Sequence, residues 1–298
     1  MRIFLTGATG FIGSHIVPEL LSAGHQVLGL TRSDAGAQAL VKAGAEPYHG
    51  TIDEPESLRA GAEQADAIIH TAFDHNFTNF VANCEKDQRV IRLLGNALAG
   101  SDRPLVITSG TGMGAAAGQL ATEDVFNAHN PNPRVASELA GAEMSAAGVK
   151  VVVMRLPQVH DAHRQGLISP LIDIARQKGI SAYVGDGLNR WAAAHVSDVA
   201  RLYLLAVEKG LAGERFHAVA EEGVSARDIA TAIGSGLGVP VTSLPQEKAA
   251  EHFGWLGMFV GLNMPASSEW TRQRLDWRPE GAGLIADLRE MDYESGVH

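Results

Sequence analysis

The most constraining feature of the chain is a glycine-rich run at its start, TGATGFIG at residues 6–13. The apolar stretch before this run predicts a strand, and the stretch after it predicts a helix. A glycine-rich turn between a first strand and a first helix is typical of dinucleotide-binding folds, in which it holds a diphosphate. Gly7 would permit the tight turn, Gly10 the close approach of backbone to phosphate, and Gly13 the packing of helix against strand. Unpaired N–H groups at the helix start would then face the phosphates.

Strand-like and helix-like patterns alternate through the first half of the chain. Strands are expected at 2–5, 25–32, 46–50, 66–72, 104–109 and 149–155, with helices at 14–21, 35–44, 55–65, 79–99 and 138–147. This alternation predicts the α/β class, with a Rossmann-type doubly wound parallel sheet that binds its ligand at the carboxyl ends of the strands.

The pattern changes after Pro157 to shorter strands and helices. These predict a smaller C-terminal α+β cap that lies over the ligand edge of the sheet and binds the substrate. The expected division is a dinucleotide-binding domain at 1–157, to which 193–212 returns, and a cap at 158–192 and 213–298. A length of 298 residues suits about two such units.

Composition narrows the classes of partner. The net charge is −10 without a lysine and arginine cluster, which argues against nucleic acid or an anionic membrane as partner. The single cysteine, Cys84, excludes an internal disulfide and agrees with a cytoplasmic location. No signal peptide is apparent, and the apolar region 253–264 is too short to span a bilayer. No histidine, cysteine and carboxylate cluster has the spacing of metal ligands, so no metal is expected.

The end of the second expected strand bears on the choice of cofactor. Sites that prefer NAD usually place an acidic residue there to hold the ribose hydroxyls, but this chain has Thr31 followed by Arg32. An arginine at this position can pair with a 2′-phosphate and stack on adenine. The sequence therefore predicts NADP(H) in preference to NAD(H). A solvated surface arginine is the alternative interpretation.

These motifs, with His70-Thr71-Ala72 and the run 195–200 (HVSDVA), resemble those of extended or atypical short-chain dehydrogenases/reductases of the NAD(P)-dependent epimerase/dehydratase type. The resemblance implies a Rossmann fold, a nicotinamide cofactor and a possible homodimer through the helices near 79–99 and 138–147. The residues that it assigns to the cofactor, together with the glycine turn and Arg32, are Gly7, Thr9, Gly10, Phe11, Ile12, Arg32, Thr51, Ile52, Thr71, Ala72, Phe73 and Pro157.

The chain departs from this family at the catalytic positions. Relatives use a serine or threonine after the fifth strand, for which Ser109 and then Thr111 are candidates. They also use a Tyr-x-x-x-Lys pair on the next helix, where this chain has Arg134 and Glu138. Arg134 could stabilise an oxyanion but hardly deliver a proton, because its guanidinium stays protonated. Glu138 lies four residues on and is expected to pair with Arg134, in the simplest case as a surface salt bridge.

Other side chains are candidates for the missing proton donor. His160 follows the segment expected at the nicotinamide edge, and histidine titrates near neutral pH. Tyr183 lies in a loop that faces the substrate in relatives, although packing is its more ordinary role. His70 and His195 are expected to be structural. Trp191, Trp255 and Phe259 are expected to pack in the core or to line a pocket.

Together these features predict an NADP(H)-dependent oxidoreductase that reduces a carbonyl or imine of a small to medium hydrophobic substrate. Ser109 would bind the heteroatom, and His160, Tyr183 or water would supply the proton. The alternative is a redox-sensing binding protein that keeps the cofactor site and has lost the catalytic pair. A sugar-nucleotide epimerase or dehydratase is disfavoured, because such enzymes rely on that pair and no basic cluster for the substrate phosphates is visible.

Overall fold

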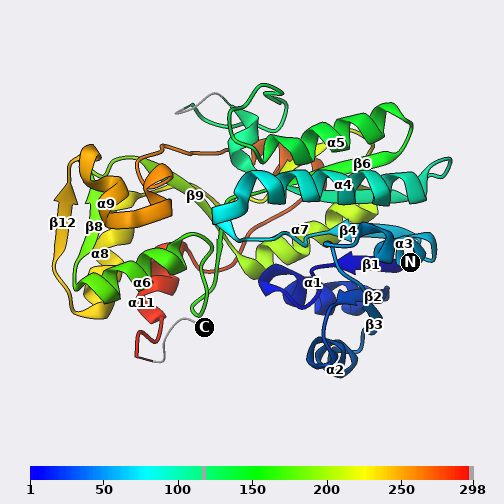
Figure 1. The fold of residues 1–298 in the computed structure, drawn as a ribbon, viewed down its shortest axis with the longest axis horizontal. Coiled ribbons are helices and arrows are strands. Elements are labelled where there is room, and N and C mark those ends of the chain that lie inside the picture. The colour runs from blue at the N-terminus through cyan, green and yellow to red at the C-terminus, as the bar shows by residue number, and fades with distance from the viewer. Residues whose placement is uncertain (116–118, 295–298) are drawn as a thin grey trace.

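A seven-stranded parallel sheet forms the larger part of the molecule (Figure 1). The computed structural model describes residues 1–115 and 119–294. The strand order is β3-β2-β1-β4-β5-β6-β10. The strands β2 and β3 are added on one side of β1 and the later strands on its other side, so the order of addition reverses between β1 and β4. At such a reversal the carboxyl ends of the strands flank a crevice in which ligands bind. The strands are β1 (Arg2–Thr6), β2 (Gln26–Thr31), β3 (Glu46–His49), β4 (Ala67–His70), β5 (Pro104–Gly110), β6 (Lys150–Leu156) and β10 (Arg215–His217).

Helices cover both faces of this sheet, because successive side chains of each strand point to opposite faces. In β1, Ile3 and Leu5 join the core under one helical layer, whereas Phe4 joins the core under the other. The first layer contains α1 (Phe11–Ser22), α2 (Asp34–Ala43) and α7 (Val196–Lys209), and the second contains α3 (Arg59–Glu63), α4 (Phe80–Leu98) and α5 (Val135–Ala146). The α4 and α5 helices lie side by side (Figure 1), and the homodimer expected through them stays a prediction.

A smaller α+β body lies beyond the carboxyl ends of the large sheet, at the left of Figure 1. A three-stranded sheet of β7 (Gln158–His160), β9 (Arg190–His195) and β11 (Glu221–Ser225) connects it to the large sheet. Beyond it lie the two-stranded sheet of β8 (Ser181–Val184) and β12 (Val241–Leu244) and the helices α6 (Ile168–Lys178), α8 (Ala226–Leu237), α9 (Ala249–Phe253) and α11 (Leu284–Glu290). The predicted fold class, a doubly wound sheet with a smaller C-terminal body, is confirmed.

The boundary expected at residue 213 does not match the sheet. The β10 strand lies within the range assigned to the cap, yet it pairs in parallel with β6 and extends the large sheet. The α10 helix (Glu269–Leu275) packs against β10 and α7 as well. The C-terminal third of the chain therefore contributes to both bodies. Sequence periodicity could not assign the three-residue β10 to either sheet, because so short a strand carries no face pattern.

Short 3₁₀ helices occur in several connections. They are η1 (Pro55–Leu58), η2 (Phe77–Asn79), η3 (Thr111–Gly114), η4 (Gln246–Lys248) and η5 (Gly254–Met258). Of these, η2 and η3 follow β4 and β5 at the carboxyl edge of the large sheet, and η5 follows α9.

Candidate functional site

The turn between β1 and α1 has the backbone geometry that a diphosphate cradle needs. Gly7 has a positive φ of 72°, and a Cβ there would lie 2.6 Å from Oγ1 of Thr71. A Cβ on Gly13 would lie 2.0 Å from the carbonyl oxygen of Gly7. Side chains are therefore excluded at both positions. Gly10 is the N-cap of α1 and no side chain caps the helix, so its first N–H groups are available to an anion.

Two hydrogen bonds hold the segment after β4 against β1, directly before this turn. Oγ1 of Thr71 donates to the carbonyl oxygen of Thr6 at 2.7 Å, and the N–H of Ala72 donates to Oγ1 of Thr6 at 3.2 Å. Phe73 follows, and Pro157 is half-buried between β6 and β7. The residues present thus fit a dinucleotide that crosses the carboxyl ends of β1 and β4.

Arg32 lies directly after β2 and is exposed. Its guanidinium makes no hydrogen bond or ion pair with any residue in the described part of the chain. The neighbouring Ser33 instead caps α2 by accepting a hydrogen bond from the N–H of Gly36. Ile52, expected near the adenine, is half-buried against the core. The Arg32 guanidinium is therefore available to an anionic ligand.

Arg134 does not pair with Glu138, and that expectation was wrong. Nη1 of Arg134 donates to Oδ2 of Asp87 and to Oγ of Ser137, both at 2.6 Å, and Nη2 donates to the carbonyl oxygen of Thr108 at 2.9 Å. Its Cζ lies 4.0 Å from the ring centroid of Phe73. Burial alone would raise the pKa of Asp87, but the charge of Arg134 and the hydrogen bonds that Asp87 accepts outweigh this and lower it.

Glu138 belongs to a second ion-pair network, in which its own side chain and that of Arg155 are fully buried. Arg155 donates to both carboxylate oxygens of Glu138, through Nε at 2.8 Å and Nη2 at 2.9 Å, and Arg215 donates to Oε2 at 3.2 Å. The Glu138 side chain has no exposed area, so a surface salt bridge is excluded. The two positions that hold tyrosine and lysine in relatives are therefore bound to separate carboxylate and guanidinium partners.

Ser109 lies near the end of β5, where the crevice opens. Its side chain is 3% exposed, and its Oγ has no hydrogen-bond partner among the described residues. Thr111 is buried at the start of η3. A buried hydroxyl without a partner costs free energy unless something completes its hydrogen bonding. Ser109 is thus a polar group at this edge that can bind the heteroatom of a ligand.

His160 is fully buried in the structure. Its Nδ1 contacts Oδ2 of Asp287 at 2.6 Å, and its Nε2 has no partner among the described residues. Burial lowers the pKa of His160, and the hydrogen bond to Asp287 opposes that effect only in part. The ring of His195 lies 5.9 Å away between centroids. The proposed role of His160 as a proton donor stays a prediction.

His195 and His70 make hydrogen bonds that fit the structural roles expected of them. Nδ1 of His195 caps α7 by accepting from the N–H of Ser197. His70 is buried between Oγ1 of Thr6, at 2.6 Å, and Oδ1 of Asp87, at 3.0 Å. Cys84 is buried as well, and burial raises the pKa of its thiol to about 11.

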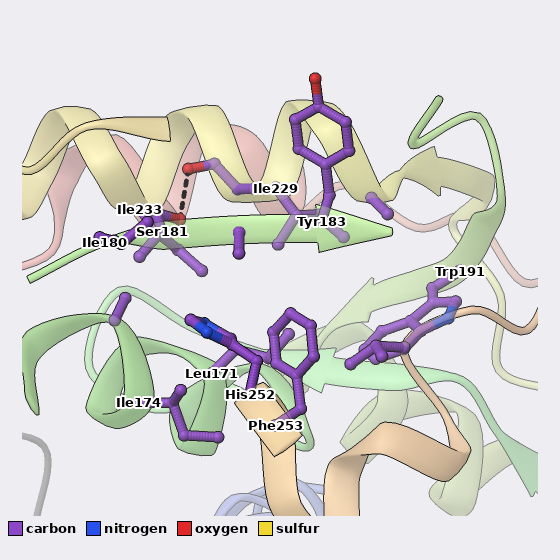
Figure 2. Close-up of a pocket in the computed structure, with 15 residues that line it drawn as sticks. Leu171, Ile174, Ile180, Ser181, Tyr183, Trp191, Ile229, Ile233, His252 and Phe253 are labelled. Carbon is purple, nitrogen blue, oxygen red and sulfur yellow. Dashed lines mark hydrogen bonds between the residues drawn. The ribbon is translucent and has the colours of Figure 1, made fainter. Parts of the chain in front are cut away.

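Tyr183 lies on β8 in the smaller body, beside a cavity lined mostly by aliphatic and aromatic side chains. Figure 2 shows its phenol ring turned away from His252 and Phe253, which project toward the middle of that cavity. Trp191 lines the same cavity and donates from Nε1 to the carbonyl oxygen of Leu262. The cavity is therefore apolar, and the hydroxyl of Tyr183 does not point into it.

Aromatic side chains from the segment after β4 and from η5 form a group, in which no motif assigned a role to His75 or Phe77. Phe77 stacks on Trp255 of η5, with ring centroids 4.4 Å apart and an interplanar angle of 9°, and Phe259 lies 6.2 Å from Phe77. His75 lies edge-on to Phe73 at 5.3 Å. Desolvation lowers the pKa of His75, and the charge of Arg134 lowers it further. The available signal was the density of aromatic residues in 73–80, FDHNFTNF.

In the part of the chain that the structure describes, no three histidine, cysteine or carboxylate side chains gather as metal ligands would. No helix in residues 1–115 and 119–294 has the length and apolar character needed to cross a membrane.

Known proteins match nearly all of the chain. The NAD dependent epimerase/dehydratase family matches residues 3–219. An uncharacterized protein of Schizosaccharomyces pombe is 45% identical, over 98% of this chain and 100% of its own length. The 4-hydroxy-2-methyl-3-oxo-4-farnesyl-3,4-dihydroquinoline-1-oxide ketoreductase of Stigmatella aurantiaca is 26% identical, over 89% of this chain and 84% of its own. The UDP-glucose 4-epimerase of Thermus thermophilus, solved in complex with NAD, shares the fold with a TM-score of 0.74 at 21% identity, covering 98% of this chain and 97% of that one.

Proposed function

Because the chain belongs to the NAD dependent epimerase/dehydratase family, whose members bind a nicotinamide cofactor, we propose that it is an NADPH-dependent reductase. Its substrate is a small to medium apolar molecule with a C=O or C=N bond. The observation that carries this proposal is the buried, unpartnered Oγ of Ser109 at the carboxyl end of β5. A site of this kind offers one hydrogen bond to a heteroatom beside the cofactor.

The preference for NADPH is supported by Arg32. A free guanidinium directly after β2 suits a 2′-phosphate, and the preceding Thr31 offers no carboxylate to the ribose hydroxyls. Arg32 would bind that phosphate, and the first N–H groups of α1 would bind the diphosphate.

The arrangement of Arg134 and Glu138 supports a reduction over an epimerisation or dehydration. Both are tied into buried ion pairs, so neither can move a proton to or from a sugar hydroxyl. A simple reduction needs less acid–base chemistry, and a protonated imine needs none at the nitrogen. Arg134 keeps a positioning role, because it holds Phe73 and the carbonyl of Thr108 beside the crevice.

An apolar substrate is supported by the surroundings of the crevice. Phe77, in the segment after β4, stacks on Trp255 of η5, and Phe73 lies edge-on to Phe80. The cavity of the smaller body is apolar too. The Stigmatella aurantiaca relative is by its name a ketoreductase whose substrate carries a farnesyl group, which agrees with this class.

When bound, the reduced cofactor supplies a hydride to the electrophilic carbon. Ser109 donates a hydrogen bond to the oxygen or nitrogen, on which negative charge develops as the hydride arrives. A proton from water or from His160 then completes the alcohol or amine. His160 can supply it only when its ring is protonated, a form that burial disfavours and that the hydrogen bond from Nδ1 to Asp287 favours. Its Nε2 has no partner among the described residues.

The test is NADPH consumption across a panel of apolar ketones, aldehydes and imines. We expect turnover that falls by about 100-fold in Ser109→Ala, by loss of a hydrogen bond that strengthens in the transition state. Ser101→Ala, at the turn after α4, is the matched control and retains activity. Arg32→Ala should raise the Kd for NADPH about 10-fold without changing that for NADH. Tight NADPH binding without turnover on any substrate would favour the redox-sensing alternative.

A further inference from the structure

A cavity of about 390 Å³ lies beside the glycine turn, between two walls from distant parts of the chain. The turn supplies Thr9, Gly10, Phe11 and Ser14 to one wall. The loop after β7, residues 161–164, and residues 291–292 supply the other. None of the sequence motifs assigns a role to this second wall. We propose that Arg164 binds the cofactor diphosphate from the side opposite the glycine turn. This inference rests on the proposed function, in which the protein binds NADPH.

The loop that carries Arg164 is held in one conformation by its own hydrogen bonds. Oδ1 of Asp161 accepts from the N–H groups of His163 and Arg164, both at 2.7 Å, and the N–H of Asp161 donates to the carbonyl oxygen of Arg164 at 2.9 Å. The next residue, Gln165, is fully buried, and its N–H donates to Oγ of Ser169. The side chain of Arg164 therefore extends from a fixed backbone.

The guanidinium of Arg164 faces the start of α1. Its Cζ lies 5.6 Å from the ring centroid of Phe11, the first residue of that helix. Its charge also acts on His75, in the segment after β4 that is expected to line the cofactor. Arg164 thus faces the start of α1, which is one of the segments expected to hold the dinucleotide.

A guanidinium at this place has the chemistry that a diphosphate requires. Its planar set of N–H donors binds two phosphate oxygens at once, and it stays charged at every physiological pH. The helix start offers backbone N–H groups on the other side, so the phosphates would have donors on two faces. Asp161 and Asp292 also line the cavity, and their carboxylates repel an anion. The diphosphate would therefore bind on the side where Arg164 meets Phe11.

The test compares four variants with the unmodified protein, with NADPH and NADH as ligands and calorimetry as the measurement. Arg164→Ala should raise both dissociation constants by the same factor, about 10- to 100-fold, because both nucleotides carry the diphosphate. Arg164→Lys should give an intermediate loss, since it keeps the charge and loses the paired donors. Arg32→Ala should weaken NADPH alone. Arg278→Ala removes the same charge from an exposed site and should change neither constant.

Two results separate this inference from the function on which it rests. If Arg164→Ala leaves both constants within about twofold while Arg32→Ala weakens NADPH, the inference is overturned and the proposed function stands. If the unmodified protein binds neither nucleotide, both are overturned. Thermal unfolding of each variant checks that a lost affinity does not come from a lost fold.

Discussion

At the scale of the residue, Arg134 and Glu138 show why spacing on a helix does not determine partners. They are four residues apart on adjoining turns, and that spacing favours a pair. In the structure each has a better partner from another element: Asp87 of α4 binds Arg134, and Arg155 of β6 binds Glu138 with two hydrogen bonds. A buried bidentate ion pair outweighs an exposed pair, which contributes little.

This arrangement predicts that the tyrosine and lysine of relatives cannot simply be restored. Glu138→Lys, alone or with Arg134→Tyr, would leave Arg155 without its carboxylate and add a third cation beside Arg215. We expect a loss of about 3–5 kcal/mol in the free energy of unfolding, measured with urea. Glu143→Lys on the same helix breaks only the exposed pair with Arg92 and should cost less than about 1 kcal/mol. Equal stability of the two variants would contradict the assignment.

At the scale of the element, the unit of β1, turn and α1 was predictable because its cause is local. The strand alternates between two cores, Gly7 requires a positive φ, and the helix starts at a glycine without a side-chain cap. Each property depends on residues within a few positions of one another. The next five strands of the sheet were predicted to within about two residues of their bounds for the same reason. The three-residue β10 and the segment of η2 carry no such local pattern.

We expect alanine to have very different effects on stability at Gly13, in this unit, and at Gly95, in α4. A Cβ on Gly13 would meet the backbone oxygen of Gly7 at 2.0 Å, whereas a Cβ on Gly95 in α4 would meet the flexible side chain of Met144 at 2.6 Å. Gly13→Ala should cost about 2–3 kcal/mol of stability, because the backbone cannot move away, and should abolish NADPH binding. Gly95→Ala should stay within about 1 kcal/mol of the unmodified protein, because alanine favours the helix. NADPH binding by Gly13→Ala at normal affinity would refute the packing argument.

At the scale of the whole molecule, the C-terminal third contributes to the smaller body and also contacts the large sheet. His217 of β10 contacts the carbonyl oxygen of Ser267 through Nδ1, at 2.8 Å, and Arg155 through Nε2, at 3.2 Å. Trp277 donates from Nε1 to the carbonyl oxygen of Asp198 on α7. These contacts join segments that are 50 or more residues apart. They hold the segments on both sides of α10 against the large sheet and α7.

Because His217 is buried in these contacts, we expect the stability of the fold to fall at acidic pH. Burial lowers the pKa of His217 to about 3, and the charge of Arg155 adds to the effect. An unfolded histidine titrates near a pKa of about 6.5, so between pH 6.5 and 3 the unfolded chain binds a proton that the folded chain does not. This site should therefore reduce stability by about 1.4 kcal/mol for each unit by which the pH falls in that window. His217→Gln should reduce the slope of unfolding free energy against pH, measured with urea; an unchanged slope would contradict the assignment.

The sequence by itself determined the glycine turn, the parallel sheet and the place of Arg32 directly after the second strand, because these depend on neighbouring residues and on patterns of period two or 3.6. Only the tertiary structure decided which carboxylate binds Arg134, that Glu138 is buried, that His160 is paired with Asp287, and that Arg164 faces the start of α1. Those contacts join residues far apart in the chain. Their partners follow from how the strands and helices pack, and no local preference of the backbone specifies that packing.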